Sequence, residues 1–325
     1  MLQRLHDPTE VNTQDKESSM AKFINVATIG GMVMERGEES PEEPLRQFRE
    51  AAQKLDGTGV DLVITCETMM MNQPVGSGEN PENPGPILTE YMEFAKRNRC
   101  TVAGAARILV GGRSRQSILY YGPDGSLLGM YHKMFPTDES IRKGTLPGSG
   151  AVAVDTPAGR LGGILCFDLN FDELRDEYTR LRPDVLCFSS YFHGAHVQAN
   201  WALRTHAFFA GAVKDGTSDI LDPLGRVLNS TTYYNRIAWA RINLDRFVMH
   251  GACNSEKWPD TRRKYRDKIL IDSDSPSGFS VLYSCTDEFT AQNVAAEFGL
   301  VSAEDYLNGC RKLRENVLKK LPRNE

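Results

Sequence analysis

The chain has 325 residues, 40% of them hydrophobic and 25% charged, so it can bury a large core and is not expected to be disordered. Its formal net charge of -5 gives no electrostatic reason to expect a nucleic acid partner or an anionic membrane. The seven cysteines include no C-x-x-C pair, which argues against a zinc ribbon or a disulfide framework and favours reduced thiols in a cytoplasmic protein.

The N-terminal half reads as helices that alternate with strands. Residues 1–21 are polar, lack the apolar segment of a secretory signal, and are expected to form a flexible arm. The pattern then predicts strands at 22–29, 61–65, 101–109, 115–121 and 126–132, helices at 44–55 and 87–98, and a loop at 72–86. The last two of these strands flank a Pro-Asp-Gly turn at 123–125 and are expected to form a hairpin.

The second half continues this alternation until about residue 245. Strands are expected at 151–156, 161–166, 185–189, 208–213, 219–221 and 236–243, and helices at 172–181 and 198–207. The alternation predicts one α/β domain over 22–245, with mixed sheets inside and helices outside. Residues 246–288 look charged and irregular, and 303–320 read as a polar helix. The segment 246–325 is therefore interpreted as a C-terminal extension, and no run in the chain approaches the ~18 apolar residues of a membrane span.

Three buried strands end on a reactive side chain. D-L-V-I-T-C-E ends at Glu67, L-L-G-M-Y-H-K at Lys133, and R-L-G-G-I-L-C at Cys166. Ligands of open α/β sheets bind at the carboxyl ends of strands, so these ends can bring together a carboxylate, an ammonium and a thiol.

Each of the three residues also has an ordinary structural explanation. Cys166 follows the pair Gly162-Gly163 and precedes a helix, where backbone N–H groups can activate a thiol, but it could equally be a buried inert cysteine. Lys133 alone could be a solvated loop lysine, and Glu67 alone could belong to a structural salt bridge. The ordered set of three is much more specific than any one of them.

The segments that carry these residues resemble the nitrilase superfamily of carbon–nitrogen hydrolases, whose catalytic triad is Glu-Lys-Cys. The matching segments are D-L-V-I-T-C-E, Y-H-K-M-F-P-T-D-E, G-G-I-L-C-F-D-L-N-F-D-E and S-D-I-L-D-P-L-G-R-V-L. The resemblance covers roughly residues 22–245 and implies an α-β-β-α sandwich that pairs into a homodimer or a higher homo-oligomer. It also implies that Glu139, at the place of the family's second glutamate, orients Lys133.

The resemblance implies a covalent mechanism without a metal or an organic cofactor. Glu67 would act as the base for Cys166, and Lys133 with the backbone N–H of Phe167 would stabilise the oxyanion. The pair Phe167-Asp168 after the nucleophile resembles amidases and carbamoylases, whereas nitrilases more often carry Cys-Trp-Glu. The expected substrate is thus a small amide or an N-carbamoyl (ureido) compound.

The substrate pocket is less well indicated. The family often carries a glutamate in the segment that corresponds to 204–210, and this chain has none there. Candidate pocket residues are Asp168, Asn170, His193, His196 and Arg204, and Arg175 is a further arginine that could meet a substrate carboxylate.

Other classes of function remain open from the sequence. His193, His196 and His206 could serve a metal hydrolase, although the spacing lacks the H-E-x-x-H register. The same triad could pass its thioester to an amine, as an acyltransferase, or could hydrolyse a nitrile. The altered segment 204–210 also allows a degenerate protein that only binds a ligand.

Overall fold

A computed structural model describes residues 22–31, 42–70, 77–273 and 276–321 of the chain. The N-terminal arm expected at 1–21 and the beginning of the loop expected at 72–86 lie outside the described residues. In the described part, no helix has the length and apolar composition to cross a membrane.

Two six-stranded mixed sheets form the centre of the molecule. The first has the order β12-β1-β2-β3-β4-β5, with β1 Phe23–Ile29, β2 Leu62–Thr65, β3 Thr101–Val110, β4 Arg113–Tyr121, β5 Leu127–His132 and β12 Ile237–Asn243. The second has the order β11-β10-β9-β8-β7-β6, with β6 Ala153–Thr156, β7 Gly159–Leu165, β8 Val185–Phe192, β9 Phe208–Asp215, β10 Asp219–Leu221 and β11 Val227–Ser230. The strands β1, β2 and β3 are parallel, as are β7, β8 and β9.

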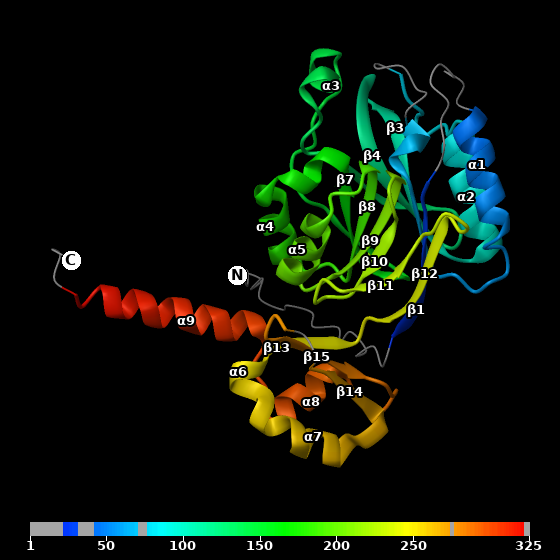
Figure 1. The fold of residues 1–325 in the computed structure, drawn as a ribbon. Helices are drawn as coiled ribbons and strands as arrows, with labels where there is room; N and C mark the ends of the chain where they lie inside the picture. The colour runs from blue at the N-terminus through cyan, green and yellow to red at the C-terminus, as the bar shows by residue number, and fades with distance from the viewer. Residues whose placement is uncertain (1–21, 32–41, 71–76, 274–275, 322–325) are drawn as a thin grey trace, which may run out of the picture.

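Helices cover the outer face of each sheet (Figure 1). Helices α1 (Glu42–Gln53) and α2 (Pro86–Asn98) lie on the first sheet, and α4 (Asp172–Leu181) and α5 (His196–Thr205) on the second. The apolar face of α1 buries Leu45, Phe48 and Ala52, as its helical spacing predicts. The expected α-β-β-α sandwich is confirmed, and its expected strands and helices are present with ends shifted by no more than three residues. The short helix α3 (Asp138–Arg142) was not expected.

The two sheets approach each other closely at Gly163. A Cβ atom on Gly163 of β7 would lie 2.8 Å from the Tyr120 hydroxyl and 2.8 Å from the Tyr131 side chain, which belong to the opposite sheet. A glycine is therefore required here for the sheets to pack, as the Gly162-Gly163 pair indicates. The contact also shows that Tyr120 and Tyr131 point toward the second sheet.

The C-terminal segment is more ordered than expected. It forms a three-stranded sheet, β13-β15-β14, from β13 Arg246–His250, β14 Ile269–Asp272 and β15 Phe279–Ser284, with helices α6 Gly251–Asn254, α7 Trp258–Tyr265, α8 Ala291–Glu297 and α9 Ala303–Leu318. A small separate core includes Phe247, Met249, Leu282 and Val294. The interpretation of 246–288 as irregular is therefore wrong, because its four- to six-residue strands are too short to stand out between charged helices.

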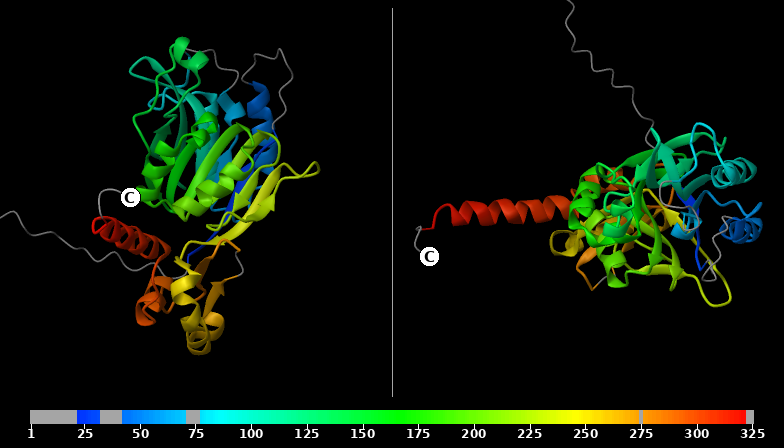
Figure 2. Two further views of the ribbon diagram at one scale, coloured as in Figure 1. Left: turned by 60° about the vertical axis from the view of Figure 1, so that its left-hand side comes forward. Right: turned by 90° about the horizontal axis from the view of Figure 1, so that it is seen from above.

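Arg246, in β13 of this C-terminal unit, contacts the sandwich. Arg246 donates to the carbonyl oxygens of His206 and Leu244 and forms an ion pair with Asp184, with 3.0 Å between Nη1 and Oδ1. Beyond the small sheet, α9 projects away from the body of the molecule in all views (Figures 1 and 2).

Candidate active site

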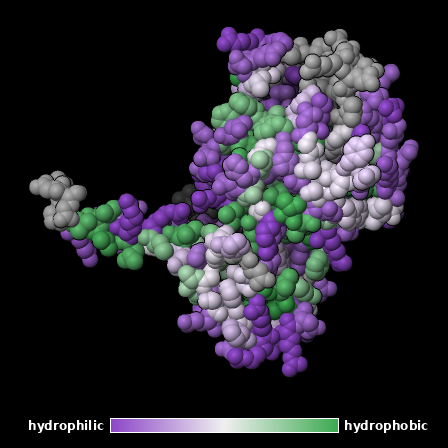
Figure 3. Space-filling view, viewed as in Figure 1, coloured by the Kyte–Doolittle hydropathy of each residue, from purple (hydrophilic) through white to green (hydrophobic). Residues whose placement is uncertain are grey.

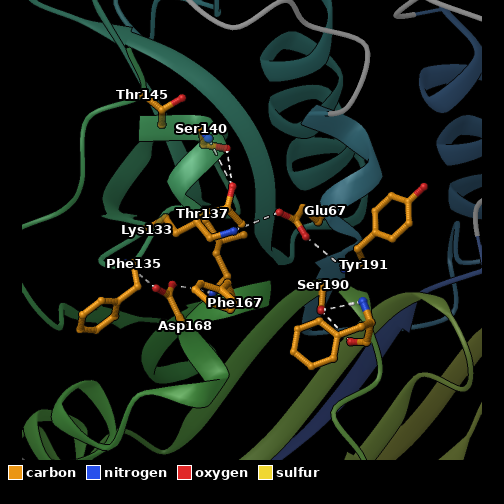
Figure 4. A network of polar contacts seen from close by, with 12 residues as sticks. Glu67, Lys133, Phe135, Thr137, Ser140, Thr145, Phe167, Asp168, Ser190 and Tyr191 are labelled. Carbon is orange, nitrogen blue, oxygen red and sulfur yellow. Dashed lines mark hydrogen bonds and ion pairs between the residues drawn. The ribbon is translucent and has the colours of Figure 1, made fainter. Parts of the chain in front are cut away.

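Glu67 stands at the start of a short 3₁₀ turn, Glu67–Met70, just after β2. Its side chain is 4% exposed. One carboxylate oxygen, Oε1, lies 3.3 Å from Nζ of Lys133, and the other, Oε2, accepts a hydrogen bond of 3.0 Å from the backbone N–H of Tyr191 (Figure 4). The carboxylate is thus held between the first sheet, which carries Lys133, and the second, which carries Tyr191 at the end of β8.

Lys133 follows β5 directly and is 2% exposed. Burial by itself lowers the pKa of the ammonium group, but the nearby Glu67, Cys166 and Asp168 raise it by more, so the net pKa lies above its ordinary value. Lys133 is therefore a permanent cation at neutral pH. It can stabilise negative charge that develops beside it, but it cannot serve as a base.

Cys166 joins β7 to a 3₁₀ helix, Cys166–Asn170, and its backbone φ is +48°. A positive φ is unfavourable for a residue with a Cβ atom and is maintained only where surrounding contacts require it. Burial and the negative charge of Glu67 raise the pKa of the thiol to about 11, while Lys133 opposes this shift. The thiol of Cys166 is consequently neutral at neutral pH and would need a neighbouring base to lose its proton.

Asp168 fixes the turn that presents Cys166. It is completely buried and accepts three hydrogen bonds, from the Tyr131 hydroxyl (2.7 Å), the Phe135 N–H (2.8 Å) and the Leu165 N–H (3.0 Å). Burial raises the pKa of this carboxyl to about 6, against the opposing effects of Lys133 and the hydrogen bonds. Both of its oxygens are occupied inside the protein, so the structure gives no support to the prediction that Asp168 lines the substrate pocket.

Glu139 does not occupy the position expected of it. It lies on the one-turn helix α3 with an exposed side chain and forms an ion pair with Lys143. Within the described residues the ion pair of Lys133 is with Glu67. The expectation that Glu139 orients Lys133 is not supported, because α3 turns this carboxylate toward solvent.

The remaining pocket candidates are dispersed. Asn170 is exposed and donates to the Phe167 carbonyl, and His193 pairs with Asp219 at 2.8 Å between Nε2 and Oδ2. His196 is exposed at the start of α5, whereas Arg204 lies at the other end of that helix and lines a surface groove between α4, α5, β13 and α9. Arg204 therefore belongs to a different surface from the one near Cys166.

The three histidines considered as metal ligands do not form one group. His196 and His206 lie at opposite ends of α5, on the order of 15 Å apart at the rise of an α-helix. His206 packs near Phe279, and burial, followed by nearby arginines, lowers the pKa of its imidazole to about 4. In the ranges that the structure describes, no three side chains of His, Cys, Asp or Glu are grouped as metal ligands would be.

Residues that were not singled out from the sequence complete the site. Tyr191 supplies the N–H that binds Glu67, and its hydroxyl accepts a hydrogen bond from Lys214. Tyr131 donates to Asp168 and accepts from the Met134 N–H at 3.1 Å. The strand predicted from the sequence ends at residue 189, whereas β8 continues to Phe192 and includes Tyr191, so the sequence carries no signal for the role of Tyr191.

The aromatic side chains around Cys166 form one wall of the site. Phe135 stacks on Phe171 with 3.8 Å between ring centroids, and Phe167 meets Phe171 edge to face. Phe167 itself is partly exposed. An apolar wall beside a half-buried thiol suits a small organic substrate.

A buried Glu67–Lys133 pair and a cysteine with a positive backbone φ thus lie at strand ends of a two-sheet sandwich. The chain belongs to the carbon–nitrogen hydrolase family, whose sequence profile matches residues 19–248.

Several amidases are among the proteins to which the chain is similar. The chain is 24% identical to omega-amidase NIT2 of Mus musculus over 258 residues, which cover 70% of this chain and 90% of that protein. It is 25% identical to a deaminated glutathione amidase of Yersinia enterocolitica over 52% of this chain and 64% of that protein. Among solved structures, Saccharomyces cerevisiae Nit3, a member of branch 10 of the nitrilase superfamily, has a TM-score of 0.58 at 17% identity, covering 69% of this chain and 91% of Nit3.

The fold is also shared with an amidase from Nesterenkonia sp. AN1 in complex with butyramide. That structure has a TM-score of 0.55 at 13% identity, covering 67% of this chain and 90% of the amidase. A further structure of the same amidase carries acrylamide added to its active-site cysteine.

Proposed function

We propose that the protein hydrolyses a small amide or N-carbamoyl compound through a thioester on Cys166. The observation that carries the proposal is the contact of Glu67 with Lys133 beside Cys166, at the ends of strands from both sheets. The similarity to omega-amidases and to an amidase that binds butyramide supports an amide as the substrate.

The reaction needs one base that acts twice. Glu67 takes the thiol proton as the sulfur of Cys166 attacks the carbonyl carbon, and the C–S bond forms. Lys133 and the backbone N–H of Phe167 stabilise the oxyanion. The C–N bond then breaks while Glu67 returns the proton to the leaving nitrogen. Water, deprotonated by Glu67, attacks the thioester, and the acid leaves as the thiol is restored.

The position of Glu67 agrees with this double role. Its two oxygens are held by Lys133 and by the Tyr191 N–H, so the carboxylate cannot rotate away between the two proton transfers. Lys133 stays charged throughout and compensates the negative charge that moves between Glu67, the sulfur and the oxyanion. No step requires a metal ion.

The test is an ammonia-release assay over short primary amides, N-carbamoyl compounds and the matching nitriles. We expect turnover of amides or carbamoyl compounds, unaffected by EDTA, and a fall of at least about 10⁴-fold in Cys166→Ala. The control is Cys285→Ala, which removes an exposed thiol of the C-terminal unit. Turnover retained in Cys166→Ala, or lost only with EDTA, would refute the proposal.

A further inference from the structure

A row of three polar side chains crosses the first sheet beside the site. Arg107 of β3 lies directly opposite Gln116 of β4, and the N–H of Lys133 donates to the Gln116 carbonyl at 2.9 Å. Opposed residues of neighbouring antiparallel strands point to the same face of a sheet. Tyr131 points toward the second sheet, and a period of two gives Lys133 the same direction. Arg107 and Gln116 therefore share the inner face with the catalytic lysine.

In the part of the chain that the structure describes, Arg107 is a buried cation without an ion pair. It is 6% exposed, and its Nη1 donates to the Thr145 hydroxyl at 3.1 Å and, more weakly, to the Ser114 hydroxyl at 3.5 Å. Within the described residues it has no ion pair, and its Nε has no hydrogen-bond partner. A guanidinium group stays charged in proteins, and burying it is costly unless an anion lies beside it.

The two buried carboxylates of the site, Glu67 and Asp168, do not form an ion pair with Arg107. Burial lowers the pKa of Arg107, and Glu67 is close enough to oppose this shift, but the oxygens of Glu67 are already engaged by Lys133 and Tyr191. The oxygens of Asp168 are engaged as well. Beside Arg107, the Oε1 atom of Gln116 is also buried without a partner. Two neighbouring side chains thus retain unused hydrogen-bonding capacity next to the catalytic group.

We propose that Arg107, with Gln116, forms an anion-binding subsite that selects substrates with a carboxylate at the end remote from the scissile amide. The inference rests on the proposed function. The guanidinium fork would bind the carboxylate, and the side-chain amide of Gln116 would rotate to donate to it through its NH₂ group, because Oε1 can only accept a hydrogen bond. Two strand spacings separate the backbones of Arg107 and Lys133, about 10 Å. This span suits a short monoamide of a dicarboxylic acid.

The first test compares two substrates of similar shape. Succinamate carries a carboxylate where 4-methylpentanamide carries an isopropyl group. We expect the unchanged protein to prefer succinamate, and Arg107→Met to lower kcat/KM for succinamate about 10- to 100-fold, mainly through KM, with less than about 3-fold change for 4-methylpentanamide. Arg113→Met, an exposed arginine at the start of β4, is the matched control and should alter neither substrate.

A second variant and a binding measurement test the anion-binding subsite independently of the proposed amide hydrolysis. Arg107→Lys retains a buried cation without the fork and should give an intermediate loss. Isothermal titration of succinate into Cys166→Ala should show binding that Arg107→Met in the same background weakens at least 10-fold. Equal losses for both substrates, or unchanged succinate binding, would overturn the subsite. If no amide is hydrolysed, the proposed function fails, while succinate binding still decides the role of Arg107.

Discussion

At the scale of single residues, Cys166 has an unusual backbone conformation. Its φ of +48° places the side chain at a sharp turn between β7 and the 3₁₀ helix. Both Cys166→Ala and Cys166→Gly remove the sulfur, but only glycine adopts this conformation without strain. We expect the free energy of unfolding, measured by urea denaturation, to be about 0.5–1 kcal/mol higher for Cys166→Gly than for Cys166→Ala, so that the glycine variant is the more stable. Equal or reversed stabilities would show that the turn is not strained.

The protonation of Cys166 gives a second prediction at this scale. Its pKa of about 11 is raised by burial and then by the charge of Glu67, and lowered by Lys133. Alkylation by iodoacetamide, quantified by mass spectrometry on the Cys166 peptide, should therefore accelerate as the pH rises toward that value. The midpoint should move to lower pH in Glu67→Gln, which removes a negative charge, and to higher pH in Lys133→Met. Midpoints that do not move, or that move in the opposite directions, would show that the charges of Glu67 and Lys133 do not set the pKa of Cys166.

At the scale of elements, the junction of β7 with the 3₁₀ helix is held by Asp168. In Asp168→Asn the amide can present an oxygen either to Phe135 or to Tyr131 and Leu165, and its NH₂ group then faces a donor. We expect a loss of about 1–3 kcal/mol in the free energy of unfolding and a fall in kcat, because the turn that presents Cys166 loosens. Asp172→Asn, on the exposed first turn of α4, is the control. If neither the free energy of unfolding nor kcat changed in Asp168→Asn, the hydrogen bonds of Asp168 would not be needed to hold this turn.

How far the sequence predicts these elements depends on the range of the interactions involved. Glu67, Lys133 and Cys166 could be singled out because each ends an apolar strand, and strand ends of one domain meet at the site. The role expected of Glu139 followed from the resemblance of its motif to the family, and such a motif does not say which way the side chain on a one-turn helix faces. Arg107 was missed because its position beside Lys133 follows from the antiparallel register of β3, β4 and β5. That register is a long-range property that no local pattern shows.

At the scale of the whole molecule, helix α9 contacts the rest of the chain near its N-terminal end and is exposed over the remainder of its length. Of α9, only Ala303 is buried, while Leu313, Val317 and Leu318 are exposed, and hydrophobic residues gather along the projecting helix (Figure 3). An isolated helix with exposed apolar residues gains most by packing on another surface. Together with the family resemblance, this favours at least a dimer, as expected from the sequence.

The oligomer prediction is tested by light scattering after size-exclusion chromatography. We expect the unchanged protein to have at least twice the mass of one chain at micromolar concentration. The double variant Leu313→Glu with Val317→Glu should weaken the assembly, whereas Lys312→Glu on the same helix should not. A monomeric mass for the unchanged protein would refute the prediction.

The central claim is that Cys166 carries the acyl group of the substrate. Its most direct measurement is the intact mass of the protein after acid quenching during turnover of a short amide. We predict an added mass equal to the substrate minus ammonia, located on the Cys166 peptide and absent from Cys166→Ala. Turnover without any acylated protein on the time scale of the first catalytic cycle, or an adduct on another residue, would contradict the account.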